Sequence, residues 1–117
     1  MRFGNENRVR LARDFTYIKE NSVKADCSAF VFYCLPRPES SVSRIGIVAS
    51  KRVGDAVERN TAKRRFRAIF RETAPQFKSR CDILVFVRRG YSRFEYSRLS
   101  QKFLAAANVA MENAAQK

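Results

Sequence analysis

The spacing of apolar residues predicts a helix in the middle of the chain, between Asp55 and Ala74. Asp55 followed three residues later by Glu58 is a capping-box pattern, which marks the first turn of a helix. Pro75 disfavours the helical conformation in the residue before it, so the helix is expected to end at Ala74. Successive residues rotate by about 100° around a helix, and this rotation sorts the side chains into faces. The apolar face consists of Ala62, Phe66, Ile69, Phe70 and Thr73.

Two further helices are predicted, one near each end of the chain. Leu11, Phe15 and Ile18 have the i, i+4, i+7 spacing of a packing stripe, and Asn21 can end that helix. The second begins after Ser92–Glu95, which is another capping-box pattern, and runs toward residue 111. Its packing stripe consists of Leu99, Phe103, Ala106 and Ala110.

Three strands are predicted by runs of apolar and β-branched residues, at Ser28–Leu35, Arg44–Lys51 and Asp82–Arg88. Gly46 within the second strand indicates a bulge or a close approach of another group to the backbone. A short pairing segment is expected to continue through Arg52 and Val53. The first strand carries Phe30, Phe32 and Cys34 on one face and Val31, Tyr33 and Leu35 on the other. Since both of its faces are apolar, we expect this strand to lie inside a sheet that helices cover.

The predicted fold is a small two-layer α+β sandwich, in the order helix, strand, strand, helix, strand, helix, with a sheet of about four strands. The last strand is one apolar run and follows the central helix, so we expect a strand-helix-strand unit whose strands are parallel. The length of 117 residues fits a single domain. Residues 1–10 and 112–117 are polar or terminal and are expected to be loosely ordered.

The charge balance indicates a polyanionic partner. Lys and Arg number 24 against 11 Asp and Glu, which gives a net charge of +13. Such a charge opposes compaction unless counter-charge offsets it. Nucleic acid is favoured over a membrane, because no apolar run approaches the roughly 20 residues that span a bilayer. The first residues lack the apolar stretch of a secretory signal, so a cytoplasmic location is expected.

The basic residues of the central helix are sorted into rows. Arg59, Lys63, Arg67 and Arg71 form one i, i+4 row, with Asn60 and Arg64 in a second row beside it. Like charges at this spacing destabilise a helix by a few tenths of a kcal/mol per pair, and the acidic residues lie on the opposite flank. A solvated surface is the simpler interpretation. A face that binds phosphates is favoured, because an anion would offset the repulsion.

A metal centre or a protein active site is not expected. Cys27, Cys34 and Cys81 are too widely spaced for a zinc site, and the chain contains no His. We therefore interpret them as reduced thiols packed like small apolar side chains. The acidic residues are scattered, whereas a two-metal nuclease needs carboxylates that converge.

The central segment resembles the arginine–asparagine–arginine signature of the bacterial ribonuclease P protein subunit. The matching residues are Lys51, Gly54, Ala56, Val57, Arg59, Asn60, Lys63, Arg64 and Arg67. The flanks match as well, so that the resemblance covers roughly residues 8–87. The sequence departs from the pattern at Thr61, where the family usually has a third basic residue, and at Lys19, where relatives often carry an aromatic residue.

This resemblance implies a function in removing the 5′ leader from precursor tRNA. The RNA subunit of the holoenzyme would perform the hydrolysis with Mg²⁺, and the protein, a monomer, would supply no catalytic residue and hold no metal tightly. The family's fold also joins the central helix to the sheet by a left-handed crossover, which is rare. The expected RNA-binding residues are Lys51, Arg52, Arg59, Asn60, Lys63, Arg64, Arg67 and Arg71.

Phe15 and Tyr33 are expected, by the same resemblance, to line a cleft that holds the single-stranded leader. Phosphate neutralisation and base stacking tolerate different leader sequences. From periodicity alone, both residues would be core side chains. A structural RNA-binding protein of the ribosomal type remains the alternative function. Reading of DNA bases is disfavoured, since half of the central helix is apolar.

Overall fold

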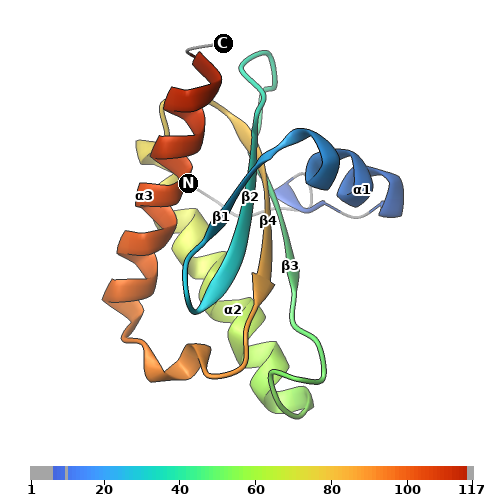
Figure 1. The fold of residues 1–117 in the computed structure, drawn as a ribbon, viewed down its shortest axis with the longest axis vertical. Helices are drawn as coiled ribbons and strands as arrows, with labels where there is room; N and C mark the ends of the chain where they lie inside the picture. Colours follow the sequence, from blue (N-terminus) through green and yellow to red (C-terminus); the bar gives the residue numbers. More distant parts are fainter. Residues whose placement is uncertain (1–6, 10, 116–117) are drawn as a thin grey trace.

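The computed structural model describes residues 7–9 and 11–115, which form a four-stranded sheet with three α-helices packed on it (Figure 1). In chain order the elements are α1 (Ala12–Asn21), β1 (Val23–Asp26), β2 (Phe30–Pro36), β3 (Arg44–Val48), α2 (Ala56–Thr73), β4 (Cys81–Val87) and α3 (Tyr96–Ala115). Short 3₁₀ turns at Ala74–Gln76 and Tyr91–Arg93 follow α2 and precede α3. The α+β class predicted from the sequence is therefore confirmed.

The sheet is mixed, with the strand order β1-β2-β4-β3. β1 and β4 both run antiparallel to β2, whereas β3 and β4 are parallel. The predicted strand-helix-strand unit, β3-α2-β4, is thus present, and β2 lies inside the sheet as expected. The left-handed crossover stays an expectation from the family.

The fourth strand does not lie where the sequence pattern placed it. Arg52 and Val53 fall in a turn after β3, and the additional strand is β1, Val23–Asp26, at the far edge of the sheet. Only Val23 and Ala25 of β1 are turned toward the core, and each is merely half-buried. A four-residue edge strand of this kind gives too weak an apolar pattern to stand out beside the preceding helix.

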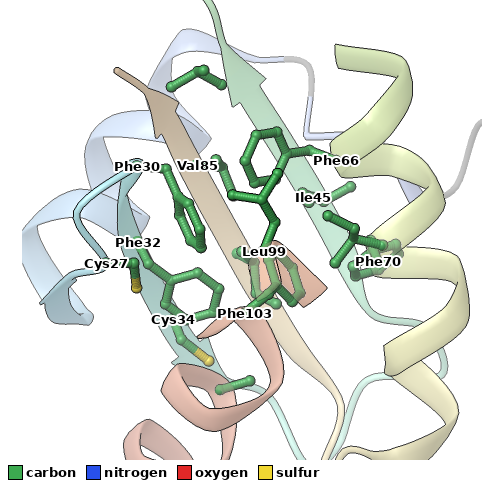
Figure 2. Packing of buried hydrophobic residues seen from close by; sticks show 14 of the residues in the cluster. Cys27, Phe30, Phe32, Cys34, Ile45, Phe66, Phe70, Val85, Leu99 and Phe103 are labelled. Carbon is green, nitrogen blue, oxygen red and sulfur yellow. The ribbon is translucent and has the colours of Figure 1, made fainter. Parts of the chain in front are cut away.

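Helices cover both faces of the sheet, so the sandwich has three layers and not the predicted two, and each face has its own apolar cluster. On one face, α3 packs on β2 and α2 packs on β3, and aromatic rings of both helices and of β2 meet at the centre (Figure 2). The rings of Phe30 and Phe66, for example, lie edge to face at 5.0 Å. On the other face, α1 buries Ile18 against Tyr33 and Leu84. The predicted apolar face of α2 is confirmed, because all five of its residues are buried.

Local capping explains where α2 begins but does not set the start of α3. Asp55 is the N-cap of α2, and its carboxylate accepts a hydrogen bond from the backbone N–H of Glu58 at 2.9 Å, as predicted. The second predicted capping box is wrong, because its serine lies in the 3₁₀ turn Tyr91–Arg93 and α3 begins only at Tyr96. The buried Tyr91 side chain packs this turn against the core, and the helix starts only after the turn.

Parts of the termini belong to the fold. The Asn7 side chain donates to the Ser43 carbonyl at 2.8 Å, and Val9 donates its backbone N–H to Ile45 at 3.1 Å. α3 runs on to Ala115, four residues beyond the predicted end at 111. The rest of the segments expected to be loose, residues 1–6, 10, 116 and 117, lies outside the described residues. Leu11, assigned to the packing stripe of the first helix, instead precedes α1 and is 49% exposed.

The cysteines pack as predicted: all three are free thiols and all are buried. Cys34 and Cys81 lie on neighbouring strands, β2 and β4. A hydrogen bond between the two thiols, together with burial, raises the pKa of Cys34 well above its usual range. Cys34 therefore stays protonated and behaves as a small apolar side chain.

Candidate nucleic-acid interface

The basic rows of α2 point away from its buried face. Asn60, Arg64 and Arg71 are exposed, whereas Arg59, Lys63 and Arg67 are partly buried. Within the described part of the chain, none of these basic residues forms an ion pair with an acid. The repulsion inferred from the sequence is therefore not relieved by the protein's own carboxylates.

Partial burial lowers the pKa of Arg67, and the excess of positive charge, here that of Arg8, lowers it further. Both effects disfavour the charged guanidinium, although Arg remains protonated at any ordinary pH. An anion bound beside Arg67 would reverse the second effect, as expected for a phosphate-binding position.

Thr61, where the sequence departs from the family pattern, interacts with its own helix. Its hydroxyl donates to the Val57 carbonyl at 2.9 Å and accepts a hydrogen bond from the Arg64 guanidinium at 3.3 Å. Thr61 therefore contributes no charge at this position but restricts the orientation of the neighbouring Arg64.

A hollow of about 290 Å³ lies beside β3, where α1 and α2 approach the same edge of the sheet. Phe15 reaches it from α1, whereas Lys63 and Arg67 reach it from α2. Its lining consists of Arg8, Val9, Phe15, Ile45, Gly46, Ile47, Lys63 and Arg67. An aromatic side chain and three cations thus share one recess, which is the combination that binds single-stranded nucleic acid.

The Phe15 ring is half-buried and rests directly on the backbone of β3. A β-carbon added to Gly46 would lie 2.7 Å from Cζ of Phe15 and 3.0 Å from a methyl group of Leu84. Only glycine leaves room for the ring at this depth. The close approach predicted for Gly46 is therefore present, and the approaching group is Phe15.

Tyr33 lies on the same side of the sheet as Phe15 but does not line that hollow. It is only 8% exposed, and its ring packs edge to face against Phe86 at 5.6 Å. The ammonium of Lys19 lies 5.1 Å from the centroid of the Phe86 ring. Of the two aromatic residues predicted for the cleft, Phe15 thus lines this hollow, whereas Tyr33 belongs to the apolar cluster against which Phe15 packs and is mostly enclosed by the protein.

A second hollow, of about 680 Å³, lies at the carboxyl ends of β3 and β4. Of the predicted RNA-binding residues it includes only Arg52, while Lys51 is exposed in the turn next to it. Its lining consists of Val48, Ser50, Arg52, Phe86, Val87, Arg88 and Arg89.

Sequence reasoning missed the contribution of Phe86, Arg88 and Arg89 to this second hollow. The signal available was a pair of arginines directly after an apolar strand, which places both just beyond the carboxyl end of that strand. Arg88 forms a bidentate ion pair with Asp26, at 2.7 and 3.0 Å. Among the described residues, Arg52 and Arg89 have no ion-pair partner, so this hollow also carries uncompensated positive charge.

No group of three or more potential metal ligands is found among residues 7–9 and 11–115. In the same residues, no helix is both long enough and apolar enough to cross a bilayer. The two hollows present cations, which can neutralise phosphates, and aromatic side chains, on which bases can stack.

Comparisons with known proteins point to one family. The family model described as Ribonuclease P matches residues 3–110. Curated relatives named ribonuclease P protein component include one from Lactobacillus delbrueckii, 35% identical over 104 residues, which covers 88% of this chain and 86% of that protein. Another, from Chlamydia pneumoniae, is 34% identical over 99 residues and covers 85% of this chain and 70% of that protein.

Solved structures with a similar fold carry the same name. The ribonuclease P protein from Thermotoga maritima superposes with a TM-score of 0.74 at 30% identity, and the match covers 86% of this chain and 94% of that one. The Staphylococcus aureus ribonuclease P protein gives a TM-score of 0.72 at 28% identity, with 86% and 91% covered.

Proposed function

Because the chain belongs to the ribonuclease P protein family, we propose that it binds a catalytic RNA subunit and assists removal of the 5′ leader from precursor tRNA. The RNA subunit performs the hydrolysis with Mg²⁺ held by RNA and substrate. The protein, a cytoplasmic monomer, adds binding energy and supplies no catalytic group.

The observation that supports this function best is the hollow shared by Phe15, Lys63 and Arg67. A single strand that enters it can stack a base on the half-buried ring while its phosphates approach the two cations. Stacking and phosphate neutralisation depend little on base identity, which suits leaders of different sequence.

The outward rows of α2 offer a second surface, for folded RNA. Asn60, Arg64 and Arg71 are exposed and do not line either hollow, so they are accessible to phosphates of a structured partner. Lys51 and Arg52, at the carboxyl end of β3, extend the positive charge toward the second hollow. A protein that combines both surfaces can hold a substrate strand and a large RNA at once.

Cleavage of a precursor tRNA by a bacterial ribonuclease P RNA tests the proposal. At low Mg²⁺ the RNA alone is expected to cleave slowly, and adding the protein should raise the rate. Bovine serum albumin at the same concentration controls for non-specific effects. A structural RNA-binding protein of the ribosomal type would bind the RNA without stimulating cleavage, and that result would reject the proposal.

A further inference from the structure

Arg44, the first residue of β3, connects the sheet to α1. Its Nε and Nη2 donate to the two carboxylate oxygens of Asp82, at 2.9 and 2.7 Å. Its third nitrogen, Nη1, lies 3.5 Å from a carboxylate oxygen of Asp14 on α1. One guanidinium therefore joins β3, β4 and the helix that carries Phe15.

The pairing with Asp82 fixes the orientation of this guanidinium. Asp82 is almost fully buried, so its charge must be compensated within the protein. Arg44 meets it in bidentate geometry, and Arg37 adds a contact at 3.0 Å. The hydrogen bonds to Asp82 are also the main reason that the pKa of Arg44 is raised. With two nitrogens held, Nη1 can point in one direction only, toward Asp14.

The register of the sheet relates this ion pair to the Phe15 site. In the parallel pairing of β3 with β4, Arg44 lies opposite Asp82, and Gly46 lies opposite Leu84. Residues two apart in a strand share a face, so both pairs face α1. The carboxylate of Asp14 contacts Arg44 of the first pair. The ring of Phe15, the next residue, lies against Gly46 of the second pair.

α1 has few other attachments of this kind. Only Ile18 of its ten residues is buried, and no side chain caps its N-terminus. Ile18 anchors the helix one turn beyond Phe15, which leaves the first turn to be held by the ring itself and by Asp14.

We propose that the Asp14–Arg44 ion pair positions Phe15 over Gly46 and thereby sets the affinity for the leader of the substrate. Asp14 acts through the ring and touches no RNA. This inference rests on the proposed function, since it concerns the same recess.

Replacing Asp14 by Asn tests the inference, with Glu20→Gln as the matched control. Both changes remove one acid from α1, so both alter the net charge equally. Glu20 is exposed and has no ion pair among the described residues. Arg44 itself is unsuitable, because its removal would leave the buried charge of Asp82 poorly compensated and would endanger folding.

The measurement is the leader preference of the reconstituted holoenzyme, defined as the Kd for mature tRNA divided by the Kd for precursor tRNA. We expect Asp14→Asn to lower this ratio about threefold, a size typical of a partly exposed ion pair. Glu20→Gln should leave it unchanged, and Asp14→Glu should restore most of it. In a Phe15→Ala background, Asp14→Asn should cause no further loss, because the two residues act as one unit.

Three results would overturn the inference. The first is an unchanged leader preference in Asp14→Asn, and the second is a loss that adds fully to that of Phe15→Ala. The third is a leader preference in Asp14→Glu as low as that in Asp14→Asn, which would show that a carboxylate at this position does not position the ring. If the unmodified protein itself lacks a leader preference, the proposed leader site fails and this inference fails with it, whereas the first three results leave that site intact.

Discussion

Phe15 of α1 lies on Gly46 of β3 so closely that an added β-carbon would be 2.7 Å from the tip of the ring. This contact defines the floor of the recess in which Phe15 meets the cations of α2. Because the contact is so close, adding one methyl group to Gly46 tests whether the position of the Phe15 ring matters for binding.

Gly46→Ala is expected to displace the Phe15 ring and weaken leader binding. The ring tip is the flexible end of a half-buried side chain and can move outward, so the domain should fold with a loss of about 1–3 kcal/mol. The leader preference of the holoenzyme should fall, as measured by Kd with precursor and mature tRNA. In a Phe15→Ala background the same substitution should leave that preference unaltered. A full effect there would mean that Gly46 acts independently of Phe15.

Phe15→Ala should reduce affinity for precursor tRNA far more than for mature tRNA. Stacking of a base on an aromatic side chain contributes about 1–3 kcal/mol, or roughly 5- to 150-fold in Kd. The control is Tyr17→Ala, since Tyr17 is an aromatic residue of the same helix that is 55% exposed and lies outside the hollow. Circular dichroism melts would show whether the variant is folded. A protein that unfolds instead would establish Phe15 as a core residue.

Replacing Arg64 and Arg67 together by Ala should flatten the salt dependence of RNA binding. Each phosphate contact contributes about 0.7–0.9 to the slope of log K against log salt, so the slope should fall by roughly two. Arg80→Ala with Arg98→Ala removes the same charge from exposed positions off α2 and provides the control. Equal slopes for both double variants would show that α2 does not contact the RNA.

The sequence predicts those elements whose signals lie within a few neighbouring residues, and it does not predict contacts between residues that are distant along the chain. α2 is predicted almost to the residue because its signals are local: a cap at Asp55, a 3.6-residue period and Pro75. β1 was missed because four residues at a sheet edge bury little. The recess itself could not be predicted from spacing, since Phe15 and Lys63 meet only after α1 packs against the sheet beside β3. Family resemblance supplied both Phe15 and Tyr33, of which Phe15 lines the recess and Tyr33 lies in the apolar cluster beneath α1.

Tyr96 at the start of α3 should make stability sensitive to alkaline pH. Burial and a hydrogen bond to Glu72 raise the pKa of Tyr96 from 10.0 to about 12. The folded state therefore holds the phenol proton more tightly than the unfolded state does, and the stabilisation is complete below pH 10. It should be lost as the pH rises from about 10 to 12. Because the side chain is more than a third exposed, we expect a loss below about 1 kcal/mol.

The difference in unfolding free energy between the unmodified protein and Tyr96→Phe isolates this effect from the titration of lysines. Urea denaturation at pH 9 and at pH 11.5 measures it. The unmodified protein should lose more stability than the variant between these two values, because it alone carries the Tyr96 phenol, whose pKa is raised in the folded state. Tyr17→Phe, which alters an exposed phenol of α1, is the control and should show no such difference. A pH dependence of Tyr96→Phe equal to that of the unmodified protein would mean that the hydrogen bond to Glu72 does not stabilise the fold.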